Sequence, residues 1–140
     1  MTMKNKIQAA GVGITYKGSV LLAKRIEKYK GKPVPYPGYW SIFTGTVDDG
    51  ESLVDCAARE LMEESQIKLD PKTFTFIKTI SREDTDLSVF FVESDELLVP
   101  VLNEESTGYG WFSINSLDSF TEKLDDEILN SIKTWHSKCK

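Results

Sequence analysis

The sequence predicts an α/β fold in which a mixed β-sheet lies between helices, as an α/β/α sandwich. Extended segments with alternating apolar residues come in pairs, and two segments carry apolar residues at helical spacing. The order along the chain is strands, loop, helix, strands, helix, which favours helices on both faces of one sheet. The chain has 140 residues and shows no internal repeat or interdomain linker, so we expect a single domain, residues 1–140.

The N-terminal part is predicted to form two paired strands followed by a loop. Residues 7–16 alternate loosely, and a Lys-Gly turn leads into a second extended segment, residues 19–25. Three prolines fall between residues 27 and 39, which excludes a helix or a central strand there. A short apolar strand is expected at residues 40–43.

A helix is predicted to follow this strand. Ser52 is the expected N-cap, and Asp55, three residues later, gives a variant of the capping box. Pro71 sets the outer limit of the element. The apolar stripe that would face the sheet consists of Leu53, Ala57 and Leu61, widened by Val54 and Ala58.

The C-terminal half is predicted to contain two more paired strands, a short aromatic strand and a helix. The paired strands are residues 74–80 and 87–93, and the aromatic strand is 108–112. Apolar residues at helical spacing from Thr121 onward indicate an amphipathic helix packed on the sheet. The side chains expected to share a sheet face are Phe74, Phe76 and Ile80 in one strand and Leu87, Val89 and Phe91 in the next.

The composition is ordinary for a soluble protein, with 40% hydrophobic and 28% charged residues. Its apolar runs are much shorter than the roughly 20 residues that cross a bilayer, and the first residues lack the apolar core of a signal peptide. We therefore expect a cytoplasmic protein with no membrane partner. The net charge of −5 argues against broad nucleic-acid binding, although bound metal and local basic residues would still admit a small anionic substrate.

Zinc sites and nucleophilic triads find no support in the sequence. Cys56 and Cys139 are far apart and match no zinc-binding spacing. Cys56 falls on the helix side that carries small residues, so we expect a buried, inert thiol. His136 is the single histidine and lies near the end of the last helix, which leaves no partner for a serine or cysteine triad.

An acidic cluster on the first predicted helix carries the strongest functional signal. Glu60, Glu63 and Glu64 stand at positions i, i+3 and i+4, so their carboxylates point to the same side. Crowded like charges are unfavourable unless a cation neutralises them, and Mg²⁺ or Mn²⁺ is best suited to several hard oxygen donors. An acidic helix face is more often simply solvated. The upstream glycine loop and Arg59 inside the cluster favour a metal site that handles phosphate.

The stretch from Gly45 to Ile67 resembles the signature of Nudix hydrolases, which is Gly, five residues, Glu, seven residues, Arg-Glu-apolar-any-Glu-Glu-any-Gly-apolar. The resemblance implies a Nudix-like, MutT-like fold along most of the chain and hydrolysis of a phosphoanhydride bond. At the required spacings this chain supplies Gly45, Glu51, Arg59, Glu60, Leu61, Glu63, Glu64 and Ile67.

Two positions depart from the family pattern. Gln66 stands where the family has Gly, and Thr44 stands before Gly45 where a second Gly is frequent. Gly at the helix end usually permits a left-handed turn, so Gln in that conformation would cost about 1 kcal/mol unless the helix ends differently. Thr44 could change how closely the loop approaches phosphate and so affect the choice of substrate. Neither departure removes a metal ligand.

The signature residues receive roles from the chemistry of pyrophosphate, whose negative charge repels an attacking water. Mg²⁺, with Mn²⁺ as a substitute, would offset this charge and acidify a bound water, and a carboxylate would take the proton. Arg59 is expected to orient a carboxylate or the loop, and Glu51 to fix the loop and Arg59. The expected metal ligands are the Gly45 carbonyl, which a loop without a side chain can bring close, and Glu60, Glu63, Glu64 and Glu105.

Residues outside the signature are assigned by the layout that the resemblance implies. Glu105 is the candidate for a further carboxylate at the metal site, with Glu104 in reserve; two solvated loop carboxylates are the alternative. Strand-end Lys24 and Arg25 would lie near the phosphates, or be solvated. Tyr36 and Tyr39 beside the proline loop could stack on a base or belong to the core. The loops 27–38 and 103–109 are expected to decide the substrate.

The first hypothesis is an enzyme that hydrolyses, with Mg²⁺, a nucleoside diphosphate linked to another moiety. That moiety could belong to a nucleotide, a dinucleoside polyphosphate, ADP-ribose or a nucleotide sugar. The alternative is a catalytically silent nucleotide-binding sensor with the same fold. A third option, isomerisation of a prenyl diphosphate, would require an additional cysteine or acid that the sequence does not identify. The oligomeric state is left open between a monomer and a homodimer.

Overall fold

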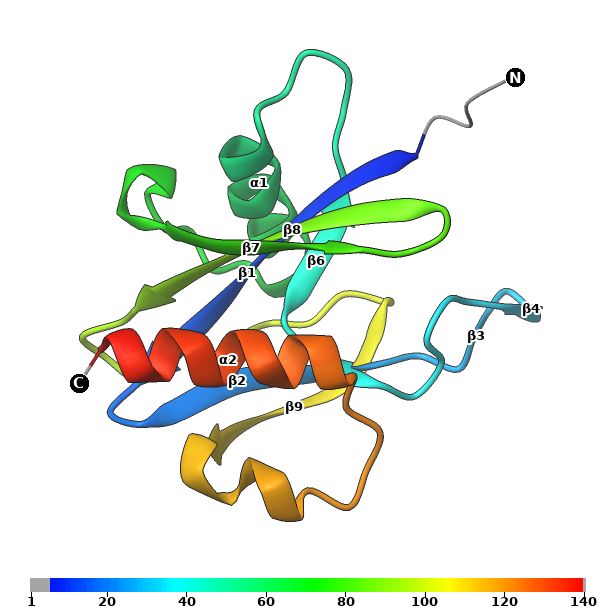
Figure 1. Cartoon of the computed structure of the whole chain (residues 1–140). Coiled ribbons are helices and arrows are strands. Elements are labelled where there is room, and N and C mark those ends of the chain that lie inside the picture. Colours follow the sequence, from blue (N-terminus) through cyan, green and yellow to red (C-terminus); the bar gives the residue numbers. More distant parts are fainter. Residues whose placement is uncertain (1–5, 140) are drawn as a thin grey trace.

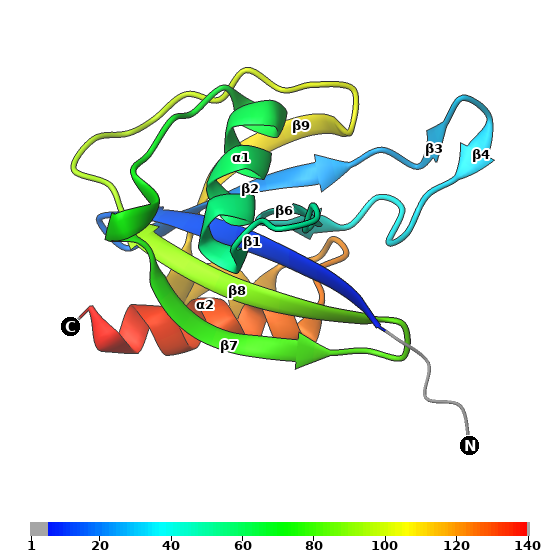
Figure 2. The same cartoon turned by 90° about the horizontal axis from the view of Figure 1, so that it is seen from above.

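The computed structural model describes residues 6–139, and one mixed β-sheet forms their centre. Helix α1 (Leu53–Ser65) covers one face of this sheet, and helix α2 (Asp126–Lys138) covers the other (Figures 1 and 2). The predicted arrangement of a sheet between helices is therefore confirmed. Neither of these helices is long and apolar enough to cross a membrane.

Strand β1 organises the sheet because it has neighbours along both edges. It pairs in parallel with β8 along one edge, and on the other edge it pairs antiparallel first with β6 and then with β2. The strands β2 and β6 therefore diverge from a common neighbour. The sheet consists of β1 (Ile7–Tyr16), β2 (Ser19–Arg25), β5 (Trp40–Ser41), β6 (Phe43–Thr46), β7 (Thr75–Ser81), β8 (Thr85–Glu93) and β9 (Ser106–Ser113).

Three short elements lie outside the sheet. Strands β3 (Lys28–Tyr29) and β4 (Lys32–Pro33) form a separate two-stranded hairpin within the proline-rich segment. The 3-10 helices η1 (Pro71–Thr73) and η2 (Ile114–Ser119) connect larger elements. The sequence patterns did not predict the hairpin or either 3-10 helix, because elements of two to six residues are too short to show a measurable periodicity.

Each face of the sheet has its own apolar core. On the α1 face, Ala10, Val12 and Ile14 of β1 pack with the buried side of α1. On the α2 face, the predicted row of Leu87, Val89 and Phe91 packs with α2. Within α1, the residues that are completely or almost completely buried are Cys56, Ala57, Leu61, Glu64 and Ser65.

The expected buried thiol is confirmed, and the expected stripe of α1 is observed at Val54, Ala57 and Leu61 but not at Leu53 or Ala58. Cys56 is completely buried, as predicted, and burial raises the pKa of its thiol to about 11. Leu53, in contrast, is exposed at the first turn of the helix and is not part of the core.

The prediction that Phe76 and Ile80 share a face is wrong. A β-bulge between Phe76 and Lys78 shifts the register of β7 against β8. Because a bulge inserts one residue into one strand, the side chains beyond it change faces. Phe76 is 51% exposed and packs edge-on against Phe90, whereas Ile80 is buried in the core under α2.

Two boundaries also differ from the prediction. The strand expected at residues 40–43 is interrupted at Ile42, so that β5 pairs with β2 and β6 pairs with β1. The last helix begins at Asp126 instead of near Thr121, and Asp125 is its N-cap. The Asp125 carboxylate accepts hydrogen bonds from the backbone N–H groups of residues 127 and 128, which fixes the start of the helix there.

Both ends of α1 are fixed by local hydrogen bonds. Ser52 is the N-cap, as predicted, and its hydroxyl accepts a bond from the Asp55 N–H at 3.2 Å. At the other end Gln66 adopts the left-handed conformation, with φ 60° and ψ 15°. Its N–H donates to the Met62 carbonyl at 2.9 Å. Of the two alternatives for Gln66, the strained left-handed turn is the one observed.

Gln66→Gly is therefore expected to stabilise the protein by about 0.5–1 kcal/mol, because Gly adopts a positive φ without strain but loses more entropy on folding. In a domain of this size, that gain corresponds to a rise in Tm of about 2–4 °C. Thermal unfolding followed by circular dichroism would measure it. Gln66→Ala is the control, since it retains the strain; equal Tm values for the two variants would contradict the argument.

Candidate active site

The acidic edge of α1 is organised by the guanidinium of Arg59. Its Nε donates to Glu51 at 2.8 Å, and its Nη1 donates to Glu60 at 2.9 Å and to Glu63 at 3.2 Å. Its Nη2 donates to Glu51 and to the Thr46 carbonyl, both at 3.0 Å. The hydrogen bonds that it donates to Glu51 and Glu63 raise the pKa of Arg59. Arg59 thus joins three carboxylates to the end of β6, which is the contact pattern expected from its planar fork.

Glu51 fixes the loop between β6 and α1. One of its oxygens accepts a bond from the Asp48 backbone N–H at 3.1 Å, and both oxygens accept from Arg59. These hydrogen bonds, chiefly those from Arg59, lower the pKa of Glu51 to about 2. The carboxylate is therefore ionised throughout the neutral range, and its bonds are all directed to the loop and to Arg59.

Gly45 lies directly against the carboxyl group of Glu60. A Cβ atom at position 45 would lie 2.0 Å from the carboxyl carbon of Glu60 and 2.3 Å from each of its oxygens. These distances are far below contact distance, so only a residue without a side chain fits here beside Glu60. The backbone of β6 and the acidic edge of α1 therefore meet at one point, as the predicted role of Gly45 requires.

Glu64 is a buried carboxyl group with an unused oxygen. Its relative exposure is 5%, and its Oε2 atom is buried without a hydrogen-bond partner among residues 6–139. Burial is the main cause of a strongly raised pKa, and the neighbouring carboxyl groups of Glu60 and Glu105 raise it further. Burial also raises the pKa of Glu60. Uncompensated buried acids are costly, and a cation between them would remove that cost.

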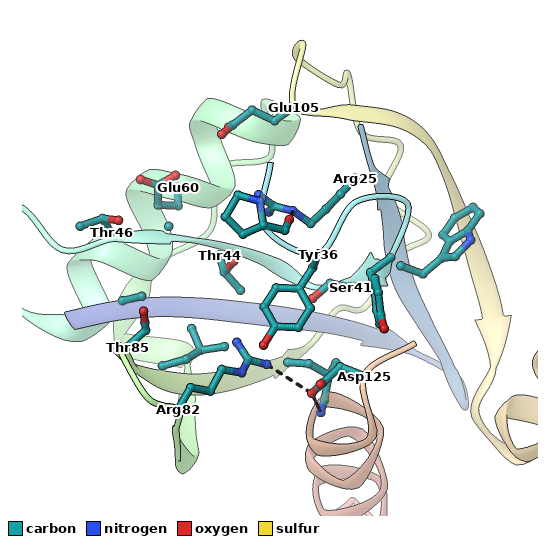
Figure 3. Close-up of a pocket in the computed structure, with 17 residues that line it drawn as sticks. Arg25, Tyr36, Ser41, Thr44, Thr46, Glu60, Arg82, Thr85, Glu105 and Asp125 are labelled. Atoms are coloured by element: carbon teal, nitrogen blue, oxygen red, sulfur yellow. Dashed lines mark hydrogen bonds and ion pairs between the residues drawn. The ribbon is translucent and has the colours of Figure 1, made fainter. Parts of the chain in front are cut away.

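A cavity of about 420 Å³ adjoins this acidic edge. Figure 3 shows Glu60 and Glu105 at the α1 side of the cavity and Arg82 and Asp125 on the opposite side. The diverging strands supply its walls, through Arg25 at the end of β2 and residues 44–46 of β6. Seven residues singled out from the sequence line it: Arg25, Tyr36, Tyr39, Thr44, Gly45, Glu60 and Glu105.

Lys24 and Glu104 lie elsewhere. The Lys24 ammonium pairs with Glu122 at 3.4 Å, outside this cavity. Arg25, the next residue, lines the cavity, and its Nε donates to the Pro35 carbonyl at 3.0 Å. Glu105 lines the cavity whereas Glu104 does not. Asn103 positions the loop of Glu105 by donating to the Glu63 carbonyl of α1 at 3.2 Å.

Comparison with known proteins assigns the family. The family model of the NUDIX domain matches residues 5–133. This chain belongs to the Nudix hydrolase family. The resemblance of residues 45–67 to the Nudix signature and the predicted fold class are both confirmed.

Individual Nudix relatives are distant in sequence. The NAD-capped RNA hydrolase NudC of Chromobacterium violaceum is 27% identical over 112 residues, which make up 80% of this chain and 40% of that protein. The chain therefore spans well under half the length of this relative.

Two solved structures share the Nudix fold closely. A MutT protein from Methanosarcina mazei has a TM-score of 0.78 at 21% identity, with 100% of this chain and 99% of that chain covered. The Nudix domain of Shewanella oneidensis NrtR, solved with ADP ribose, has a TM-score of 0.77 at 15% identity, with 99% and 91% covered.

The Nudix helix presents donors that fit a divalent cation. Carboxylate and carbonyl oxygens are the ligands that Mg²⁺ and Mn²⁺ prefer, and the free Oε2 of Glu64 is such a donor. As the side chains stand, no three acidic, histidine or cysteine side chains of residues 6–139 converge closely enough to hold an ion. Both oxygens of Glu63 bond to Arg59 at 3.2 Å, so Glu63 would have to leave Arg59 to become a ligand.

Two charged residues that line the cavity of this Nudix domain, Arg82 and Asp125, were not identified as site residues in the sequence. The Arg82 guanidinium lies 4.6 Å from the centre of the Tyr36 ring, and its Nη2 bonds to Asp125 at 3.3 Å. The three residues come from the β7–β8 turn, the proline loop and the start of α2. Only Asp125 carries a local signal, because an aspartate before an amphipathic helix is typical of an N-cap.

Proposed function

We propose that this Nudix chain hydrolyses, with Mg²⁺ or Mn²⁺, a phosphoanhydride bond in a nucleoside diphosphate linked to another moiety. The observation that carries the proposal is the acidic edge of α1, where Glu60 and Gly45 line a cavity and the neighbouring Glu64 is buried with its Oε2 atom unpartnered among the described residues. A carboxylate edge of this kind repels a diphosphate unless a cation lies between them. The donor set and the cavity together therefore favour a metal-dependent reaction on phosphate.

Residues of this chain would bind the cation, position its ligands and accept a proton. The cation would be held by the Gly45 carbonyl and by the carboxylates of Glu60, Glu63, Glu64 and Glu105. When bound, it neutralises phosphate charge and lowers the pKa of water. Arg59 keeps Glu60 in place and fixes the loop together with Glu51. Glu63 is exposed on the acidic edge and Glu105 is exposed at the cavity wall, and whichever of the two is not bound to the cation is our candidate for the group that takes the proton from water.

The cavity would receive the nucleotide. Its volume of about 420 Å³ lies within the usual range of roughly 300–1,000 Å³ for small-molecule sites. Arg25 offers a cation at the cavity wall, and Tyr36 and Tyr39 offer aromatic surface. The NudC relative is named for NAD-capped RNA, and the Shewanella domain was solved with ADP ribose. Both ligands contain a nucleoside diphosphate linked to another group, which agrees with this substrate class.

A substrate panel tests the proposal most directly. The panel consists of NAD, ADP-ribose, diadenosine polyphosphates and nucleotide sugars. Each compound would be incubated with the protein and Mg²⁺ or Mn²⁺ in heavy-oxygen water, and mass spectrometry would give the masses of the products. We expect cleavage of one phosphoanhydride bond, with the heavy oxygen on a phosphate product. Binding of ADP-ribose without any product would favour the sensor instead. A product that retains its diphosphate would favour an isomerase, and either result would overturn the proposal.

A further inference from the structure

The hairpin formed by β3 and β4 projects from the body of the protein as a separate arm (Figures 1 and 2). In the sequence it lies between Arg25 and Pro35, and both of these residues line the candidate substrate cavity. The base of the arm is therefore part of the cavity wall. We define the arm as residues 28–33.

The arm is strongly basic in a protein that is acidic as a whole. Lys28, Lys30 and Lys32 are exposed, and within residues 6–139 none of them forms an ion pair. The six residues of the arm contain three lysines and no acidic residue, whereas the whole chain has a net charge of −5. The arm therefore concentrates three ammonium groups within six residues and forms a local positive field on an acidic protein.

The base of the arm is fixed to the cavity rim from two sides. Arg25 donates from its side chain to the Pro35 carbonyl at 3.0 Å and from its backbone N–H to the Tyr39 carbonyl at 2.9 Å. On the far side of the cavity, the Arg82 guanidinium packs over the Tyr36 ring at 4.6 Å. These contacts fix the proline loop at the cavity wall, and the arm projects from this fixed base.

An exposed aromatic ring accompanies the lysines. Tyr29 is 41% exposed, and the Lys30 ammonium lies 5.4 Å from the centre of its ring. Basic groups that follow a phosphate backbone, together with aromatic rings on which bases stack, are the usual elements of single-strand nucleic-acid binding. A membrane-binding arm would instead require several large apolar side chains near its tip, where this arm has Lys30 and Gly31.

We propose that the arm binds the single-stranded nucleic acid that continues from a diphosphate held in the cavity. The substrate class would then include oligonucleotides whose 5′ end carries the linked nucleoside diphosphate. This inference rests on the proposed function, because it places the scissile diphosphate in the cavity. It does not require broad nucleic-acid binding, since the arm gathers three lysines within six residues whereas the whole chain has a net charge of −5, which limits contact to a few nucleotides.

The test compares one diphosphate group in two contexts, as a free dinucleotide and at the 5′ end of a short RNA or DNA oligonucleotide. The arm variant is Lys28→Gln/Lys30→Gln/Lys32→Gln. The matched control is Lys68→Gln/Lys72→Gln/Lys138→Gln, which removes the same charge from exposed lysines that have no ion pair within residues 6–139. We measure kcat/KM against salt, and oligonucleotide binding by fluorescence anisotropy, for the wild type and both variants.

In the arm variant, kcat/KM for the oligonucleotide substrate should fall at least tenfold at low salt, whereas that for the free dinucleotide should not change. The slope of log affinity against log salt should decrease by about 2, since each phosphate contact to a single strand contributes about 0.7. The control variant should match the wild type. Comparison of the affinities for the RNA and DNA oligonucleotides then shows which of the two nucleic acids the arm prefers.

Several outcomes would overturn the inference about the arm. Equal losses in the arm and control variants would show a general charge effect. Loss of binding to anionic phosphatidylserine vesicles, with unchanged binding of oligonucleotides, would assign the arm to membranes. If the wild type hydrolyses no diphosphate at all, the proposed function fails, and the anisotropy measurement still decides separately whether the arm binds the oligonucleotide.

Discussion

Glu63→Gln is expected to reduce kcat roughly a thousandfold, because it removes one of the negative charges proposed to hold the cation while keeping the shape of the side chain. A thousandfold loss corresponds to about 4 kcal/mol, within the several kcal/mol that metal ions contribute to such transition states. Stability should change little, since the Glu63 side chain is 53% exposed and its ion pair with Arg59 at 3.2 Å is partly solvated. Initial rates over a range of Mg²⁺ concentrations and thermal unfolding curves would measure both quantities.

The matched control is Glu104→Gln, which removes an exposed carboxylate near the site that does not line the cavity. We expect this variant to behave as the wild type. Paramagnetic titration with Mn²⁺ provides a readout that does not depend on turnover, and Glu63→Gln should bind the ion more weakly. Unchanged turnover by Glu63→Gln at saturating Mg²⁺ would refute the assignment of this residue.

Local sequence patterns predicted the elements that depend on neighbouring residues in the chain. The strands β1 and β2 and the start of α1 were correctly located because alternation, a Lys-Gly turn and the Ser52 cap are all short-range signals. Phe76 was placed on the wrong face because the bulge in β7 arises from its pairing with β8. A bulge is set by tertiary pairing, and alternation within one strand cannot show it.

The same distinction explains which site residues the sequence could supply. The acidic edge and Arg59 lie within one helix and its preceding loop, so fixed spacing predicted their contacts. Lys24 and Arg25 were treated alike, but the register of β2 against β9 shifts between them, and only Arg25 lines the cavity. The contact among Arg82, Tyr36 and Asp125 joins three distant segments, and no pattern in any one of them predicts it.

The contact between Gly45 and Glu60 gives the second large expected effect. Gly45→Ala would place a Cβ atom 2.0 Å from the Glu60 carboxyl carbon, so this carboxyl group must move. The group lies at the end of a side chain and can be displaced, so the fold should lose only about 1–3 kcal/mol. Catalysis should suffer far more, because a ligand shifted by an ångström is misplaced for the reaction; we expect a loss of at least about a hundredfold in kcat/KM.

Two further variants separate this steric effect from a general effect of alanine in a strand. Gly108→Ala in β9 is the control, because a Cβ there meets no atom within 4 Å; its activity and Tm should equal those of the wild type. Glu60→Asp shortens the side chain, so in the double variant Gly45→Ala/Glu60→Asp the loss of stability should be smaller than the sum of the single losses. If the losses of stability of the two single variants add up exactly to the loss of the double variant, the contact between a Cβ atom at position 45 and the Glu60 carboxyl group is not the cause. Gly45 would then be required for its backbone conformation.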